Sequence, residues 1–144
     1  MTRSQDVVDR WLEAFNAHDE GGMRSVYADD VIFEAPGEIR LEGTDATVEY
    51  ALGWLRAFPD AEMRIESQLE ADGWIVQRFV FEGTHEDTLA APTGDIPATN
   101  RHMAGRGAQI IRVEDGKVAE DYLYFDQVQV LTQLGLMREP AGHR

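Results

Sequence analysis

The sequence predicts an α+β fold in which two or three helices and one early strand precede an antiparallel meander. Two observations carry this prediction. Apolar residues recur at spacings of three and four through most of residues 4–58, which is typical of helices, and at a spacing of two from residue 62 onward, which is typical of strands. The second observation is the Asp-Gly pair in "EDGK", a strong hairpin signal between alternating segments. Helices on one face of a curved sheet would leave an apolar cavity between the layers.

The first segment, "SQDVVDRWLEAFNAHDEGG", predicts an amphipathic helix. Val7, Trp11 and Phe15 lie on one stripe of that helix. Ser4 is expected to cap its N-terminus, and the paired glycines at the end of the segment stop the helical pattern. A short second helix is expected in "MRSVYADD", residues 23–30.

A strand follows in "VIFEAPG", which a proline and a glycine terminate. A third helix is expected in "DATVEYALGWLRAF", residues 45–58, with Thr44 as its N-cap. The apolar residues of this helix, Val48 and Leu55 among them, share one face, and the Pro-Asp pair that follows closes it.

The rest of the chain alternates with a period of two. Four strands are predicted, in "EMRIESQLE", "GWIVQRFVFEGTH", "GRGAQIIRV" and "KVAEDYLYFD". Residues 86–103, rich in Pro, Gly and Thr, are expected to form one long loop, and "QVQVLTQLG" a short last helix. We interpret residues 1–144 as a single domain with its core at about residues 5–137 and a frayed tail at 138–144.

The composition narrows the possible functions. The 144 residues carry a formal net charge of −14 and include no cysteine. An acidic chain lacks the basic surface that nucleic acids and anionic membranes attract, so neither is an expected partner. No secretion-signal pattern and no apolar stretch of bilayer-spanning length are found, and disulfides are excluded, so we expect a cytoplasmic location.

Several standard catalytic motifs are absent from the sequence. There is no glycine-rich phosphate loop, no G-x-S-x-G elbow and no H-E-x-x-H pair. The four histidines, His18, His85, His102 and His143, are scattered. A metal site built from His85, His102 and a carboxylate is conceivable, but no ligand spacing indicates it. We therefore expect neither a metal nor a cofactor.

Side-chain direction singles out two polar residues. Alternate residues of a strand share a face. Arg112 lies one residue before the hairpin loop, so its face is expected to meet solvent or a partner subunit, which places Gln109 inside. Pairing through "EDGK" then brings the region of Asp121 to within about two residues of the position opposite Gln109. The strand directions thus predict a carboxyl and an amide close together inside the fold.

Seven segments together are similar to one known group of proteins: "AFNAHD", "VYADDVIFEAPG", "GTDATVEYALGWLRAFPD", "FEGTHED", "GDIPATNR", "IIRVEDGKVAEDYLYFDQ" and "LTQLGL". Over about residues 5–137 the chain resembles the SnoaL-like polyketide cyclase and ester cyclase group of the nuclear-transport-factor-two-like superfamily. The resemblance implies a cone of three helices packed into a highly curved mixed or antiparallel sheet, usually dimeric through the outer face of the sheet. Because members of this superfamily differ in activity, each functional position needs its own comparison.

In the cyclases that the chain resembles, an aspartate of the final strand is the general acid/base and a histidine lies nearby on the preceding strand. Those positions fall on Leu123 and Gln109 here, so neither residue is kept. Asp121 lies two residues earlier on the same predicted face, and we expect it to act as general acid/base, with Gln109 donating to the developing enolate oxygen. The ketosteroid-isomerase tyrosine and base positions fall on Trp11 and Ala35, so that isomerase is not expected.

Other polar residues have two interpretations each. Epoxide hydrolases of the superfamily place an arginine between two aspartates, and Arg78 could pair with Asp121 in that way or point outward. His85 could shuttle protons at the mouth of the cavity or bond a loop carbonyl, and His102 could close over the same mouth. Asp126 is expected to cap the last helix.

We interpret the chain as a cofactor-independent enzyme that performs acid/base chemistry on an apolar, polyketide-like or aromatic carbonyl compound. The reaction would be an aldol-type cyclisation, an isomerisation or a dehydration, and a homodimer is expected. The cavity walls are expected to include Trp11, Tyr27, Phe33, Trp54, Phe58, Leu123 and Phe125. Two alternatives stay open: epoxide-hydrolase-like water addition, and a non-catalytic protein that binds a small molecule.

Overall fold

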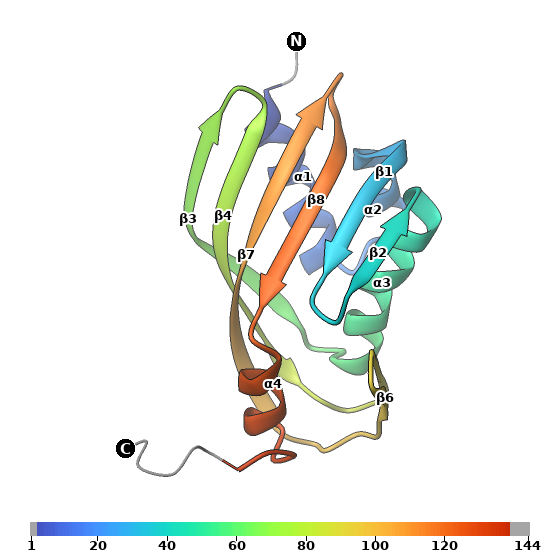
Figure 1. The fold of residues 1–144 in the computed structure, drawn as a ribbon, viewed down its shortest axis with the longest axis vertical. Coiled ribbons are helices and arrows are strands. Elements are labelled where there is room, and N and C mark those ends of the chain that lie inside the picture. Colours follow the sequence, from blue (N-terminus) through green and yellow to red (C-terminus); the bar gives the residue numbers. More distant parts are fainter. Residues whose placement is uncertain (1–2, 139–144) are drawn as a thin grey trace.

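The computed structural model describes residues 3–138, and Figure 1 shows helices packed on a curved sheet. The helices are α1 (Ser4–Asn16), α2 (Glu20–Val26), α3 (Thr44–Ala57) and α4 (Gln127–Gln133). The strands are β1 (Tyr27–Ala35), β2 (Ile39–Glu42), β3 (Glu62–Ala71), β4 (Trp74–Thr84), β5 (Leu89–Ala91), β6 (Gly94–Ile96), β7 (His102–Glu114) and β8 (Lys117–Phe125). The predicted α+β class, with three N-terminal helices and a short C-terminal one, is confirmed.

Six strands form one mixed sheet in the order β2-β1-β8-β7-β4-β3. Neighbouring strands are antiparallel except β1 and β8, which run parallel with Phe33 opposite Asp121. Figure 1 shows this N-terminal strand beside the C-terminal one. The pairing brings residues from both ends of the sequence to the same part of the sheet.

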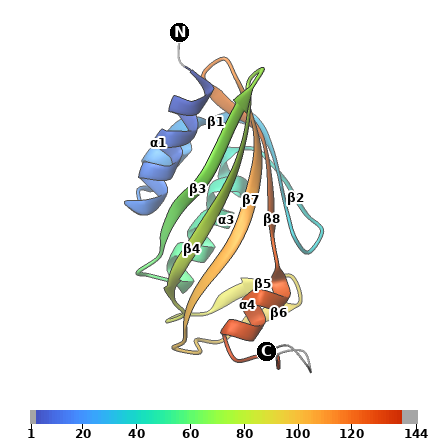
Figure 2. The same cartoon turned by 90° about the vertical axis from the view of Figure 1, so that its left-hand side faces the viewer.

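One face of the sheet is buried and the other is exposed to solvent, here called the wet face. Helices α1 and α3 lie against the buried face, whereas α4 and the β5–β6 hairpin lie at the end where β8 finishes (Figure 2). Along β4, Ile75, Gln77 and Phe79 are buried while Val76 and Arg78 are exposed, the alternation of a strand with one solvated face. Inward-facing positions therefore supply the functional cavity.

The second helix lies earlier in the sequence than expected. It begins after Asp19, whose carboxylate accepts a hydrogen bond of 3.0 Å from the backbone N–H of Gly22 and so caps the helix. It ends before Tyr27, because that residue already pairs with Val118 of β8. Residues 27–30, which were expected to be helical, belong to β1.

The predicted helix caps are confirmed at one helix and wrong at two. Asp126 accepts hydrogen bonds from two backbone N–H groups of α4 and is its N-cap, as predicted. Ser4 and Thr44 are the first residues of their helices and make no capping bond. The N-cap of α3 is Gly43, whose φ of 92° favours glycine, and the Thr44 hydroxyl instead donates to the carbonyl of Ala28 at 3.0 Å.

Two short pieces of sheet were not predicted. Strand β2 pairs with β1 at the sheet edge, and the region expected to be one long loop, residues 86–103, contains the β5–β6 hairpin. These strands are three or four residues long, too short to establish a period of two. The last residues of the expected tail, 139–144, lie outside the described residues.

The hairpin between β7 and β8 is confirmed. Asp115 and Gly116 have φ angles of 53° and 74°, the positive values that a tight Asp-Gly turn requires. Beyond the turn, the register of β7 and β8 shifts by one residue between Arg112 and Val113, and the shift places Ile111 opposite Asp121 and Gln109 opposite Leu123. Within residues 3–138, no helix has the length and apolar character needed to cross a membrane.

Candidate active site

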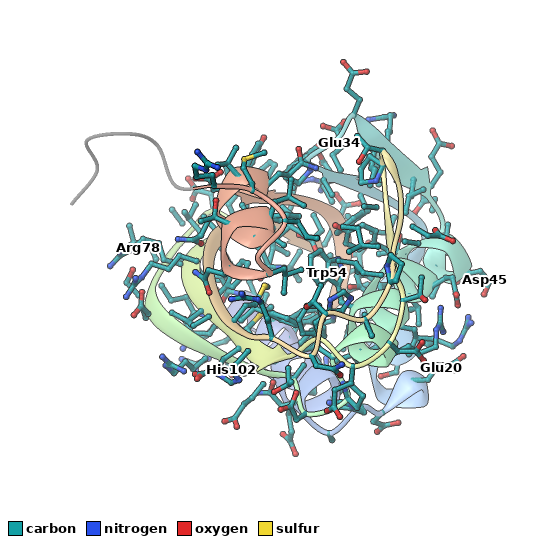
Figure 3. All side chains as sticks on the ribbon, turned by 90° about the horizontal axis from the view of Figure 1, so that it is seen from below. Glu20, Glu34, Asp45, Trp54, Arg78 and His102 are labelled. Atoms are coloured by element: carbon teal, nitrogen blue, oxygen red, sulfur yellow. The ribbon has the colours of Figure 1, made fainter. Side chains whose placement is uncertain are left out.

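A cavity lies between the buried face of the sheet and helices α1 and α3. Its empty space measures about 660 Å³ with the open mouth included, and the centre of a water molecule can reach about 70 Å³ of it. Six of the predicted wall residues line it: Trp11, Tyr27, Phe33, Trp54, Leu123 and Phe125. Figure 3 places Trp54 near the middle of the molecule, within the surrounding strands and helices. The walls are mostly aromatic and aliphatic, which suits an apolar ligand.

Asp121 is the only carboxylate among the described residues that line this cavity. Only 3% of its surface is exposed, and burial among apolar side chains raises its pKa from the ordinary 3.8 to about 7. Its Oδ1 atom has no hydrogen-bond partner within residues 3–138. A carboxyl group with this pKa is present as both acid and base near neutral pH, which suits proton transfer.

Gln109 lies beside Asp121 on the neighbouring strand. Its side chain is 3% exposed, and its Oε1 atom accepts a hydrogen bond of 2.9 Å from Nε2 of Gln77. The amide of Gln109 lies near the carboxyl of Asp121 without reaching a close hydrogen bond, and as a donor it partly offsets the rise in the pKa of that carboxyl. The structure thus brings together the amide and the carboxyl that the strand directions placed close to each other.

Two tyrosines, Tyr27 and Tyr50, lie near the carboxyl of Asp121. Burial, together with the negative charge of Asp121, raises the pKa of Tyr27 well above its ordinary 10 and that of Tyr50 to about 12. Both hydroxyls therefore keep their protons and can donate hydrogen bonds. The indole N–H of Trp11 is buried near the Tyr27 hydroxyl without reaching a close hydrogen bond. Tyr50 was not among the predicted site residues. The sequence feature that could have identified it is its position one helical turn before Trp54, with a hydroxyl on an aromatic side chain.

Phe58 and His85 do not line the cavity, contrary to expectation. Phe58 lies behind Trp54, with ring centres 5.8 Å apart, because its position at the end of α3 turns it away from the sheet centre. The His85 ring also stacks on Phe58, with ring centres 5.2 Å apart, and is fully buried. The two rings support the wall that Trp54 forms.

His85 holds the long loop rather than a substrate. Its Nδ1 atom accepts a hydrogen bond of 3.2 Å from the backbone of Thr99 and lies 3.0 Å from the hydroxyl of the same residue. Its backbone bonds Arg101 and Asn100, at 2.9 and 2.8 Å. Burial lowers the pKa of the ring, which favours the neutral form that accepts from Thr99. Of its two expected roles, the structure supports attachment to the loop.

Arg78 lies on the wet face, so the expected pair with Asp121 is not formed. Gln77 and Phe79 point inward, and the residue between them must therefore point outward. The Nε atom of Arg78 donates to the hydroxyl of Ser67 at 2.9 Å. Figure 3 shows Arg78 at the periphery of the molecule.

His102 also lies outside the cavity. Its Nε2 atom is 2.8 Å from Glu82 and its Nδ1 atom 3.3 Å from the Thr84 hydroxyl, and its side chain is 56% exposed. The expectation that it closes over the cavity mouth is wrong, because it starts β7 on the outward face (Figure 3). In the part of the chain that the structure describes, no group of three or more His, Asp or Glu side chains is placed to hold a metal ion.

The sequence profile of the SnoaL-like polyketide cyclase family matches residues 5–134. The chain belongs to this family. Aklanonic acid methyl ester cyclase DnrD of Streptomyces peucetius is 29% identical over 143 residues, which cover 94% of this chain and 92% of that protein. Nogalonic acid methyl ester cyclase of Streptomyces nogalater is 31% identical over 86 residues, 58% of this chain and 61% of that protein. The structure of IdmH from Streptomyces antibioticus shows the same fold, with a TM-score of 0.79 at 23% identity over 93% of this chain and 99% of that one.

This SnoaL-like protein has different side chains at the two positions where the resemblance implies an aspartate and a histidine. Leu123 and Gln109 occupy them, lie directly opposite each other across β7 and β8, and both line the cavity. Asp121 lies two residues from Leu123 on the same face. The carboxyl is therefore present in the cavity, but one pleat away from the position that the family resemblance implies.

A second apolar space of this SnoaL-like protein adjoins the first. It lies among α3, the β5–β6 hairpin and α4 and measures about 620 Å³ with its opening, of which the centre of a water molecule can reach about 110 Å³. Four side chains border both spaces: Tyr50, Trp54, Phe125 and Val130. Trp54 and Phe125 contact each other edge to face, with ring centres 5.5 Å apart. The two apolar spaces therefore share a wall that includes Trp54 and Phe125.

Proposed function

We propose that this SnoaL-like protein catalyses a cofactor-independent aldol-type cyclisation of an apolar, polyketide-like or aromatic carbonyl compound. The observation that carries the proposal is the buried carboxyl of Asp121, with a pKa of about 7, beside the amide of Gln109 in an apolar cavity. A group with a pKa near the working pH both takes up and returns a proton effectively. The two cyclases named above are, by their names, methyl ester cyclases, which supports an ester-bearing substrate here.

The reaction begins with the carboxylate of Asp121. It takes a proton from the carbon next to a substrate carbonyl. The electrons of the broken C–H bond form a C=C bond, and the π electrons of the carbonyl move onto its oxygen to give an enolate. An amide nitrogen carries two hydrogens, so Gln109 can donate one to Asp121 and the other to the enolate oxygen. One such donor contributes about 10² to 10³-fold to a rate.

The second step forms the ring. The enolate carbon attacks another carbonyl carbon of the same molecule, a C–C bond forms, and the oxygen of the attacked carbonyl becomes an alkoxide. That alkoxide takes the proton back from Asp121, so the carboxylate is regenerated and no oxidant or reductant is consumed. An isomerisation or dehydration would start with the same proton transfer, and product analysis separates the three reactions.

The apolar walls would orient the substrate. Trp54 and Phe125 border both spaces, so they can hold a planar ring system whose reacting carbonyl reaches Asp121. The neutral hydroxyls of Tyr27 and Tyr50 supply further hydrogen-bond donors beside the carboxyl. Holding the two reacting carbons together in this way lowers the entropic cost of ring closure.

A non-catalytic protein that binds a small molecule is the second candidate. It is favoured by the presence of Leu123 and Gln109 where the resemblance implies the acid and the histidine. Water addition to an epoxide is not favoured, because Arg78 lies on the opposite face of the sheet from Asp121.

The test is incubation of the purified protein with aromatic polyketide esters, ketones and enones in deuterium oxide, with products identified by mass spectrometry. Asp121→Asn is measured alongside, with Glu82→Gln as the matched control at a carboxylate on the outer face whose side chain is 38% exposed. Cyclised product that depends on Asp121 supports the enzyme. Saturable binding of a compound, with no product and no deuterium exchange next to its carbonyl, would favour the binding protein.

A further inference from the structure

Three glutamine side chains form a row across the buried face of the sheet and end at Asp121. Nε2 of Gln68 on β3 donates to Oε1 of Gln77 on β4 at 2.9 Å. Nε2 of Gln77 donates to Oε1 of Gln109 on β7, also at 2.9 Å. The amide of Gln109 lies next to the carboxyl of Asp121 on β8 and acts to lower the pKa of that carboxyl. Both hydrogen bonds of the row run in the same direction, from the edge strand toward the cavity.

The middle of this row is buried in apolar surroundings. Gln77 is 1% exposed and Gln109 3%, and the inward-facing neighbours of Gln77 on its own strand are Ile75 and Phe79. An amide at such a position costs free energy unless both of its ends are bonded. An apolar side chain of similar size would pack there without that cost, so packing alone does not account for the glutamine.

The row determines which end of the Gln109 amide faces Asp121. A primary amide has one end that only accepts and one that only donates, and a half turn about its last bond exchanges them. Because Gln77 donates to Oε1 of Gln109, the donating nitrogen is turned the other way, toward the carboxyl. In the reversed orientation an oxygen would face Asp121 and repel its charged form.

We propose that Gln77 is a positioning residue for Asp121. Gln77 holds the Gln109 amide with its N–H groups toward the carboxyl of Asp121, and Gln68 orients the amide of Gln77 in the same way. The inference rests on the proposed role of Asp121 in proton transfer for its importance to function, but the orientation itself can be measured without any substrate.

Few other groups can influence the carboxyl. The titratable residues beside Asp121 are Tyr27 of β1 and Tyr50 of α3, and both keep their protons near neutral pH. Arg106 borders the cavity from β7, but its side chain is 70% exposed and its guanidinium lies 3.5 Å from Glu66 at the surface. A change in the titration of Asp121 on substitution of Gln77 therefore reports on the amide row.

The experiment is a carboxyl-carbon NMR titration of protein labelled with ¹³C at aspartate, in which Asp121→Asn identifies the resonance of Asp121. A donor stabilises the charged form, so its loss raises the pKa. We expect Gln77→Leu to raise the titration midpoint of Asp121 by roughly 0.5 to 1 pH unit, the size of one hydrogen bond. Gln68→Leu, at the part-buried end of the row, should raise it less.

A double variant separates orientation from a general change in polarity. In the Gln109→Leu protein the carboxyl has already lost its donor, so adding Gln77→Leu should not move the midpoint further. An unchanged midpoint in folded Gln77→Leu, or a full further rise in the double variant, would overturn the proposal. Should Gln77→Leu fail to fold, Gln68→Leu tests the same row, and an unchanged midpoint there would count against it.

Turnover distinguishes this inference from the proposed function. When Asp121 is the catalytic base, the rising limb of the kcat/KM profile moves to higher pH together with the NMR midpoint. A midpoint that moves while the profile stays in place would uphold the positioning role of Gln77 and reject Asp121 as the base. Loss of stability alone would change neither measurement.

Discussion

Asp121 and Glu82 lie on opposite faces of one sheet, and the two carboxylates differ in almost every property that matters for chemistry. Glu82 on β4 is bonded by Arg64 at 2.9 Å and by His102 at 2.8 Å, and these partners lower its pKa. Asp121 on β8 has an amide donor and apolar walls, and burial raises its pKa to about 7. The number of charged neighbours is therefore not what prepares a carboxylate for proton transfer; the loss of water is.

The comparison also explains why residue types alone point to the wrong face. The outer cluster holds a histidine, an arginine and a glutamate, all typical catalytic residues, yet all of them are solvated. The inner site holds a single carboxylate, amides and tyrosine hydroxyls, in a place that water reaches poorly. Electrostatic interactions are stronger there because little water screens them.

The largest expected effect is on turnover. Asp121→Asn keeps the shape of the side chain but removes the base, so kcat should fall by about 10² to 10⁴-fold. Binding of a substrate or analogue, measured by quenching of tryptophan fluorescence, should stay close to wild type because Trp54 and the other walls are unchanged. Steady-state kinetics with the product-forming substrate checks the first part.

Glu82→Gln is the matched control. It makes the same chemical change on the wet face, so it should leave kcat within about twofold of wild type. Equal losses in the two variants would show that the inner and outer carboxylates do not differ in function, and would remove the basis of the proposed mechanism.

The second effect concerns stability and pH. The pKa of Asp121 rises from 3.8 to about 7 on folding, so the folded protein holds a proton that the unfolded chain has lost between these values. This stabilisation is fully present below the lower pKa and is lost as pH rises through the higher one, a change of about 4 kcal/mol at most. Asp121→Asn should lack this loss and gain stability relative to wild type from acid to neutral pH.

Urea unfolding of both proteins across this pH range gives the difference directly, because the other carboxyl groups are common to both. Glu82→Gln should change the pH dependence in the opposite sense, since the pKa of Glu82 is lowered and its contribution is lost as pH falls. A constant difference between wild type and Asp121→Asn would mean that the pKa of Asp121 is not raised.

The third effect tests the close packing of the inner face. A Cβ atom at Gly107 would lie 2.4 Å from the ring of Phe79 and 2.7 Å from the backbone oxygen of Tyr124. Gly107→Ala should therefore cost about 1 to 3 kcal/mol in unfolding free energy, measured by chemical denaturation. Gly53 in α3 has no atom within 4 Å of such a Cβ, so Gly53→Ala should instead stabilise by up to about 1 kcal/mol.

The sequence places Asp121 and Gln109 in one cavity, but strand parity alone does not explain why they lie together. Next to the turn Glu114 pairs with Lys117, and an unbroken register would turn Asp121 to the outer face. The register shift between Arg112 and Val113 instead puts Gln109 opposite Leu123 and brings Asp121 into the cavity.

Strand parity does place Arg78 outward as soon as Gln77 is assigned inward. In the sequence, Gln77 and Arg78 are adjacent polar residues, so either one could have faced inward. The functional interpretation was given to Arg78 because it is charged.

Other errors have a different cause. His85 and Phe58 lie where a strand and a helix end, and the direction of a side chain at such a point depends on the chain path that follows. Tyr50 fits the apolar stripe of α3, so its hydroxyl beside Asp121 becomes visible only when α3 and β8 are packed together. Long-range packing, rather than local pattern, decides these positions.

The smallest expected effects belong to the wet face. Arg78 makes one side-chain hydrogen bond, to Ser67, and His102, the first residue of β7, contacts the side chains of Glu82 and Thr84 on β4. Because solvent replaces such contacts, Arg78→Ala and His102→Ala should each change the unfolding free energy by no more than about 0.5 kcal/mol and kcat by no more than about twofold. A tenfold loss of kcat in either variant, with normal stability, would mean that the outer cluster takes part in the reaction. The inner site would then be insufficient by itself, whatever the pKa of its carboxyl.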